Sequence, residues 1–303
     1  MRIFLSSPNK KEDIKIFDRV KVKNRLVAYP LLSVMDGYKV NIERLVADCK
    51  KIKGNGEMLM FDSGVSSLNW RYFENLKRLS QDATRGFVFS EEAFFKAADG
   101  YIEAIEALSG IIDCVLELDV DHFIGIEKVK KLRKRLSRRG GNLIPVWRSS
   151  QGKDEFFRVI DEYGFVALST HVGTGKSTGS AHWDALLFEA YKRGAKVHVF
   201  AFVSSKNLFE LPMYSSDCSS WGKGRRWGIV AFDSKRKRGT LSGRPAKSGD
   251  EVFGDTSFLG LSKESEFNPF DKEWVLEASI LTYISLEERV TEAWERRGVV
   301  YED

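Results

Sequence analysis

Short apolar runs of β type recur along the chain, and most of the intervals between them carry a helical pattern. The runs are RLVAYPLLS (25–33), EMLMFDS (57–63), GFVFS (86–90), CVLELDV (114–120), NLIPVWR (142–148), FVALS (165–169), KVHVFAF (196–202) and the shorter MYSSDC (213–218). Near-continuous apolar strands that alternate with helices are typical of parallel strands covered on both faces. Eight such units predict an α/β fold of the (β/α)8 TIM-barrel type, whose core needs about 250 residues. A doubly wound open sheet is the alternative.

Helix boundaries support this alternation. Ser90 precedes EEAFFKAADGYIEAIEALSG as an N-cap, and Gly140, Gly164 and Gly194 each follow a helical pattern as a C′ glycine. The long pattern at 270–298 predicts a C-terminal helix or helix pair. No linker rich in Pro, Ser or Gly divides the chain, so we expect one domain over 1–303, with a basic, glycine-rich insertion at 233–262.

Composition restricts the class of protein. The chain has 303 residues, 43% of them hydrophobic, and no apolar run approaches the ~20 residues that span a membrane. The opening MRIFLSSPNKK has too short an apolar core for a signal peptide. The chain has three cysteines, Cys49, Cys114 and Cys218, without CxC or CxxC spacing. This argues against a disulfide framework and against a metal site made of cysteines. We therefore expect a protein of the reducing cytoplasm, without a membrane partner.

Positive charge is concentrated in two segments. Residues 128–139 hold eight Lys and Arg and no acid, and residues 223–247 hold nine against Asp233 alone, although the whole chain carries only +5. Localised positive charge is typical of binding to phosphate backbones. For 128–139 the alternative is the solvated face of an amphipathic helix, because Val129, Leu132 and Leu136 share one side of it. The second segment has no apolar stripe.

Three acids follow apolar β-runs: Asp62, Asp119 and Asp217. In a β/α barrel the reactive groups lie at the carboxyl ends of the strands, so we expect the three to share one mouth. For each acid alone, a turn or capping role is the more common explanation. A pair of carboxylates can cleave a glycosidic bond, one by attacking the anomeric carbon and the other by transferring the proton.

Other chemistries find less support. The four histidines form neither HxH nor HExxH, which argues against a common hydrolytic metal centre. HVGTGKS (171–177) follows a strand as a phosphate loop would, but Thr170 stands where that loop needs its first glycine. A G-x-S-x-G elbow for a nucleophilic serine is missing.

Four segments resemble the tRNA-guanine transglycosylase family. FDSGVSS (61–67) looks like its DSGGFQ-type motif, DCVLELDV (113–120) resembles its strand with the base-reading Asp, and GFVALSTHVGTGK (164–176) is similar in placement to its AIGGLAVGE-type loop. The stretch 195–228 resembles the segment that leads to the nucleophile. Its ending, DCSSWGKGRRWG, looks closest to phage and bacterial relatives that insert 7-deazaguanines into DNA. The resemblance runs over about residues 55–228.

The resemblance implies a role for each matching residue. Asp217 would be the nucleophile and Asp62 the general acid/base. Asp119 would read the guanine edge, with Ser63 and the Ser169–Thr170 backbone nearby and Phe200 or Phe202 as a stacking wall. Flanking phosphates would meet basic residues of the second segment, namely Lys223, Arg225, Arg226, Lys235 and Arg236. Trp221 would pack at the barrel rim or against an unstacked base.

Departures from the family pattern bear on the substrate. The family's zinc site, three cysteines and a histidine in close spacing, is missing, so no metal or other cofactor is expected. Val65 and Ser66 replace the second glycine and the aromatic residue of DSGGF. The resemblance therefore implies DNA and a 7-deazaguanine base as substrates, with tRNA as the alternative polynucleotide. A non-catalytic nucleic-acid-binding barrel is the alternative from another class of protein.

Overall fold

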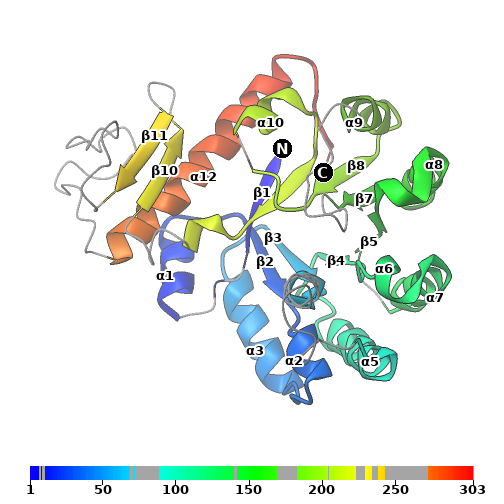
Figure 1. The fold of residues 1–303 in the computed structure, drawn as a ribbon. Coiled ribbons are helices and arrows are strands. Elements are labelled where there is room, and N and C mark those ends of the chain that lie inside the picture. The colour runs from blue at the N-terminus through cyan, green and yellow to red at the C-terminus, as the bar shows by residue number, and fades with distance from the viewer. Residues whose placement is uncertain are drawn as a thin grey trace, which may run out of the picture. The chain divides into compact units, whose positions relative to one another are not determined.

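A computed structural model describes residues 1–6, 8, 11–68, 71, 89–139, 142–169, 183–203, 205–222, 229–233, 238–242 and 272–302. The chain divides into two compact units (Figure 1). We call Arg25–Ser180 the middle unit, and Met1–Asn24 with Ala181–Asp303 the terminal unit. The fold class is the α/β barrel of parallel strands, of TIM type, with a C-terminal helix. The fold predicted from the alternating pattern is confirmed.

The middle unit contains parallel strands followed by helices. Strands β2 (Asn24–Ala28), β3 (Met58–Asp62), β4 (Cys114–Leu116) and β5 (Asn142–Ile144) lie in the order β5-β4-β3-β2, and β6 (Val146–Trp147) pairs with β7 (Phe165–Leu168). The pairs β3–β4, β4–β5 and β6–β7 are parallel. The helices are α2 (Leu31–Met35), α3 (Ile42–Lys53), α5 (Glu91–Ala107), α6 (Asp121–Ile124), α7 (Ile126–Leu136) and α8 (Gly152–Tyr163).

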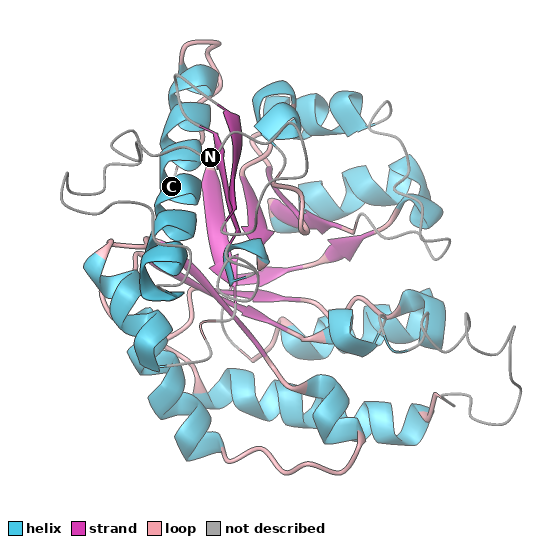
Figure 2. Ribbon diagram, turned by 60° about the vertical axis from the view of Figure 1, so that its left-hand side comes forward, coloured by secondary structure: helices cyan, strands magenta, loops and turns pink. Residues whose placement is uncertain are grey.

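Two predicted helix caps of the middle unit, Ser90 and Gly164, are present, whereas Gly140 lies outside the described residues and α7 already ends at Leu136. Ser90 Oγ accepts the backbone N–H of Ala93 at the start of α5. Gly164 ends α8 with a φ of 67°, in the left-handed region that glycine adopts without a Cβ clash. Figure 2 shows these helices packed beside the strands that they connect.

Two strand predictions differ from the structure. The run 142–148 is split into β5 and β6 at Pro145, because proline has no N–H to donate to a ladder. Its carbonyl oxygen still accepts the Ala167 N–H at 2.8 Å. For the run 86–90, residues 86–88 lie outside the described residues. Phe89 and Ser90 are in no strand and lead directly into α5.

The terminal unit places β9 (Ser215–Cys218) between β1 (Arg2–Ser6) and β8 (Lys196–Val199), and both pairs are parallel. No strand was expected before residue 25, so β1 is an addition to the prediction. Helices α1 (Lys11–Arg19), α9 (Trp183–Lys192) and α10 (Ser205–Glu210) belong to this unit, with the helix α12 (Lys272–Glu295). The C-terminal pattern forms one helix rather than a pair.

Helix α12 is anchored to β1 by a buried carboxylate. Glu287 accepts the Ile3 N–H at 2.6 Å and the side-chain amide of Asn24 at 3.1 Å. Burial raises the pKa of Glu287, although these hydrogen bonds oppose the rise. The contact fixes β1 beside β9, where Phe4 lies in register with Asp217.

The predicted basic insertion, 233–262, begins at the last residue of the first strand of a β-hairpin. Strands β10 (Ile229–Asp233) and β11 (Arg238–Ser242) pair antiparallel, from Ile229 with Ser242 to Asp233 with Arg238. These strands were not predicted from the sequence; three of the four residues between them, 234–237, are Lys or Arg. Residues 243–271 lie outside the described residues.

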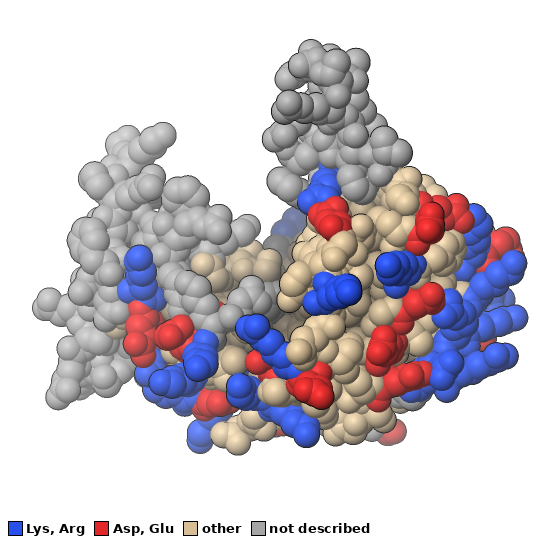
Figure 3. Space-filling view, turned by 90° about the horizontal axis from the view of Figure 1, so that it is seen from below, with Lys and Arg blue, Asp and Glu red and all other residues tan. Residues whose placement is uncertain are grey.

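Charge on the basic helix α7 is largely balanced by neighbouring acids. Its apolar side, Val129, Leu132 and Leu136, is buried, as the amphipathic alternative predicts. Four of its six basic side chains form ion pairs, namely Lys128 with Glu91, Lys130 with Glu127 and Glu155, Arg133 with Glu117, and Arg135 with Asp99. Just after the helix, Arg139 pairs with Glu106. On the face seen in Figure 3, described acidic and basic side chains are likewise interspersed. Most of the positive charge of α7 therefore stabilises the middle unit.

Candidate active site

Asp217 lies in β9, and its carboxylate is held by the turn that follows β8. The backbone N–H of Ala201 donates to Oδ1 at 2.7 Å. Ala201 has a φ of 51°, in the left-handed region that costs a non-glycine residue energy. The Asp217 side chain keeps 17% of its surface exposed. Thus one oxygen of a partly accessible carboxylate is fixed by a strained turn, and strain of this kind gathers at functional sites.

A buried histidine faces the same carboxylate. His198 is 0% exposed, and its Nε2 lies 3.4 Å from Oδ1 of Asp217. Its Nδ1 lies 3.0 Å from the hydroxyl oxygen of Ser215, its register partner on β9. The rings of Phe4 and Phe200 stand edge-on to the imidazole, at 6.1 and 5.2 Å between centroids. His198 was not predicted as a site residue, because the histidines were compared only with the spacing of metal-binding motifs.

Trp221 packs inside the terminal unit. It is 4% exposed in the short 3-10 turn Ser220–Gly222, and its indole N–H donates to the Ser6 carbonyl oxygen at 3.0 Å. Its ring meets Phe17 edge-on at 4.9 Å. Of the two interpretations of Trp221, packing is the one that these contacts support. The basic positions that follow it, Lys223, Arg225 and Arg226, lie outside the described residues, as do Lys235 and Arg236.

Asp62 is the last residue of β3 in the middle unit, and the fold itself explains the glycine after it. The Asp62 carbonyl oxygen accepts the Tyr29 N–H at 2.8 Å. Gly64 has a φ of +73°, and a Cβ there would lie 1.9 Å from the Tyr29 carbonyl oxygen. Ser63 is 2% exposed. The glycine of FDSG is thus required by the backbone.

Asp119 follows β4 and is bound by two side chains from the ends of neighbouring strands. Arg148 Nε donates to Oδ1 at 2.5 Å, and the Ser169 hydroxyl donates to Oδ2 at 2.9 Å. Asp119 and Ser169 therefore contact each other, whereas Thr170 lies outside the described residues. Arg148 was not predicted as a site residue, although it is the last residue of the apolar run 142–148.

The charge of Arg148 is stabilised by two carboxylates. Burial lowers the pKa of its guanidinium, but the charges of Asp119 and of Asp121, 3.1 Å from Nε, outweigh that effect and raise it. Asp121 is affected in the complementary way. Burial alone would raise the pKa of Asp121, but bonding to His122 and the charge of Arg148 lower it. Both groups therefore stay ionised at neutral pH.

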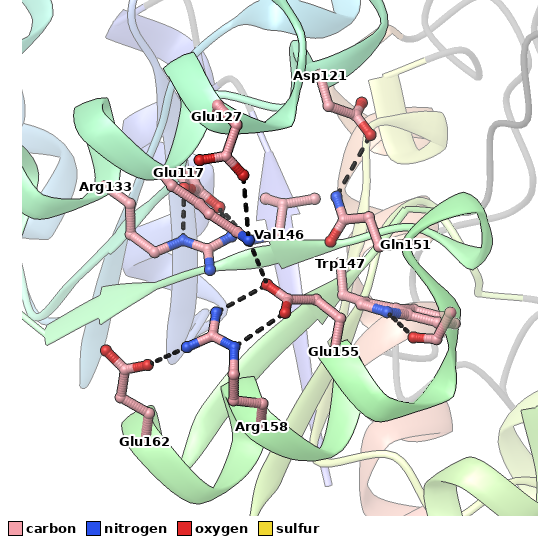
Figure 4. A network of polar contacts seen from close by, with 12 residues as sticks. Glu117, Asp121, Glu127, Arg133, Val146, Trp147, Gln151, Glu155, Arg158 and Glu162 are labelled. Carbon is pink, nitrogen blue, oxygen red and sulfur yellow. Dashed lines mark hydrogen bonds and ion pairs between the residues drawn. The ribbon is translucent and has the colours of Figure 1, made fainter.

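A cleft of about 620 Å³ opens beside this ion pair in the middle unit. Its walls come from α6, α7, the start of α8 and the ends of β6 and β7, with Asp121, Lys130, Arg148, Ser149, Gln151 and Ser169 among the lining residues. Figure 4 shows one wall, where the Gln151 amide donates to Asp121 at 3.3 Å. Both charge signs and several hydroxyl and amide groups line the cleft, which suits a small polar ligand with donors and acceptors.

The predicted site residues thus fall into two described groups. Asp62, Ser63, Asp119 and Ser169 belong to the middle unit, whereas Asp217 and Phe200 belong to the terminal unit. Within the described ranges, no three His, Cys, Asp or Glu side chains form a group that could hold a metal ion. The three cysteines are buried and form no disulfide in the described part of the chain. None of the described helices is long and apolar enough to cross a bilayer.

Comparisons with known proteins concern the fold alone. No family model and no curated protein matches the chain. Among solved structures, it is similar to mutants of the tryptophan synthase alpha-subunit from the hyperthermophile Pyrococcus furiosus. One has 14% identity and a TM-score of 0.42, with 73% of this chain and 87% of that chain covered. Another has 16% identity and a TM-score of 0.42, with 72% and 86% covered.

Proposed function

We propose that this chain exchanges guanine in DNA for a 7-deazaguanine base through a covalent bond between Asp217 and deoxyribose. The observation that supports the proposal best is the anchored carboxylate of Asp217, held at Oδ1 by the Ala201 N–H and still partly exposed. A nucleophile must be fixed in place and accessible to its substrate. The resemblance of 195–228 to the nucleophile segment of the transglycosylases points to the same residue.

The chemistry needs two steps and no net oxidation. In the first, a carboxylate oxygen of Asp217 bonds to C1′ while the bond from C1′ to guanine breaks. The electron pair leaves with guanine, which takes a proton from Asp62 acting as general acid. In the second, the incoming base returns a proton to Asp62 and attacks C1′, and Asp217 is released as a carboxylate. A buried target base would first have to leave the duplex stack, at a cost of a few kcal/mol.

Base selection is assigned to Asp119 within this proposal. A carboxylate oxygen can accept more than one hydrogen bond, so the Arg148 and Ser169 contacts leave acceptor capacity for a guanine-type edge. The adjoining cleft supplies further donors and acceptors from Ser149 and Gln151. A base that lacks the matching N–H groups would leave a desolvated acceptor unpaired, which is the physical basis for rejecting it.

DNA is the proposed polynucleotide, and tRNA is the alternative within the same chemistry. The experiment is nucleoside mass spectrometry of DNA and tRNA from cells that express the chain and are supplied with 7-deazaguanine bases. A modified deoxynucleoside that depends on expression supports the proposal. A modified ribonucleoside in tRNA instead moves the substrate to RNA, and no modification in either polymer contradicts the proposed function.

A further inference from the structure

We infer that His198 is a positioning residue for Asp217: with the Ala201 N–H it holds Oδ1 and leaves Oδ2 as the atom that attacks the sugar. The inference rests on the proposed function. Both contacts of the Asp217 carboxylate go to the same oxygen, the Ala201 N–H at 2.7 Å and His198 Nε2 at 3.4 Å. Among the residues that the structure describes, no hydrogen bond or ion pair reaches Oδ2.

The tautomer of His198 depends on which partner donates in the contact between Nδ1 and the Ser215 hydroxyl. Nδ1 lies 3.0 Å from Ser215 Oγ, so a hydroxyl that donates to Nδ1 leaves the ring hydrogen on Nε2. Nε2 is buried and has no hydrogen-bond partner within the described part of the chain. Its nearest acceptor in these contacts is therefore Oδ1 of Asp217. In this tautomer the ring nitrogen that lies nearest the Asp217 carboxylate carries the hydrogen.

The distance of 3.4 Å is longer than an ordinary N–H···O bond, which is 2.7–3.2 Å. Hydrogen bonds of catalytic groups are often long in the unliganded protein and shorten in the complex. The enclosure by Phe4 and Phe200 restricts the ring, since both meet it edge-on. A ring fixed in this way can orient the carboxylate throughout the reaction without contacting the substrate.

The assignment specifies the covalent step. Oδ2 forms the bond to C1′ as the bond to guanine breaks, and the electron pair leaves with guanine. Oδ1 becomes the carbonyl oxygen of the ester and keeps the Ala201 N–H as its donor, with His198 Nε2 beside it. No proton moves to or from His198. Removing the ring nitrogen should therefore slow ester formation and leave DNA binding unchanged.

Activity of the full chain tests this role with matched variants. We expect His198→Phe to lower kcat for labelled-guanine exchange by ~10²-fold while KM for DNA stays within about threefold, because a misplaced nucleophile affects the chemical step. His198→Gln, whose amide can place an N–H near the Nε2 position, should recover a rate within about tenfold of wild type. Ser279→Ala, a buried serine of α12 that bonds only its own helix, is the control and should exchange normally. Wild-type kcat in His198→Phe overturns the inference.

Nitrogen NMR of the wild-type chain tests the geometry without any activity. With ¹⁵N-labelled histidine, the chain's four histidines give few signals, and His198→Gln assigns the relevant one. The expected spectrum has hydrogen on Nε2 and none on Nδ1, and Ser215→Ala should change it. Hydrogen on Nδ1 in the wild-type spectrum overturns the inference. This result does not depend on whether exchange is observed or on whether the His198 variants fold. Absence of exchange by wild-type protein would instead contradict the proposed function.

Discussion

Arg148 and Asp119 form a nearly buried ion pair, with Nε 2.5 Å from Oδ1 and only 9% and 15% of the two side chains exposed. Arg148→Met would leave Asp119 and Asp121 without their cation although both side chains are largely buried. We expect the free energy of unfolding to fall by ~3 kcal/mol, since removing one partner of a buried pair leaves an uncompensated charge. Urea denaturation measures the change.

Arg158→Met is the matched control for that variant. Arg158 also pairs with two acids, Glu155 and Glu162, but it is 48% exposed. An exposed pair contributes at most ~1 kcal/mol, so the control should lose no more than that. Equal losses in the two variants would show that burial of the Arg148 pair contributes nothing.

The pair of Glu117 and Arg133 offers a second stability test (Figure 4). Two parallel hydrogen bonds of 2.8 and 2.9 Å join them inside the middle unit, and Glu117 also accepts the Val146 N–H at 2.7 Å. Arg133→Leu alone should cost ~3–5 kcal/mol. Replacing both residues by leucine should recover part of that loss, but the Val146 N–H then lacks its acceptor, at ~1–3 kcal/mol. A double variant less stable than Arg133→Leu would contradict this account.

The lowered pKa of Asp121 should make the stability of the folded chain depend on pH. Its pKa lies below the ordinary value of 3.8 in the folded chain, because bonding to His122 and the charge of Arg148 outweigh burial. A lowered carboxyl pKa stabilises the folded state above pH 3.8, and that contribution is lost as pH falls through 3.8 towards the folded value. Wild type should therefore be more stable than Asp121→Asn at pH 6, and the difference should shrink below pH 4. A constant difference between the two unfolding curves would show that the charge of Asp121 is not the cause.

If the basic residues after Trp221 contact DNA phosphates, they should contribute to the salt dependence of DNA binding. Neutralising Lys223, Arg225 and Arg226 together should weaken binding with little dependence on sequence. If each residue contacts one phosphate, the slope of log affinity against log salt should fall by ~0.9 per contact on duplex DNA, or ~0.7 on a single strand. The comparison is a titration over several salt concentrations with wild type and the triple variant. An unchanged slope would direct attention to the few basic residues of α7 that have no ion pair in the described structure, Lys131, Lys134 and Arg138.

Much of the architecture could be read from local pattern, whereas the contacts within the candidate site could not. Ser90 and Gly164 have the predicted capping roles because capping depends on residues a few positions away. Strand β1, RIFLS, was not predicted, although it is as long as the run FVALS (165–169) that was. The Arg148–Asp119 pair joins residues 29 apart in the sequence. Such pairs, like His198 with Asp217, depend on which strands are neighbours and in what register, and a single sequence does not record that.

Labelled-guanine exchange tests the central claim most directly. Wild-type protein, DNA and labelled guanine are incubated, label in the DNA is counted, and the covalent protein–DNA adduct is mapped by mass spectrometry. The account predicts incorporation of label and an adduct on Asp217, and Asp217→Asn should bind DNA in a gel shift but give neither. No incorporation by wild type, an adduct on another residue, or exchange by Asp217→Asn would contradict it.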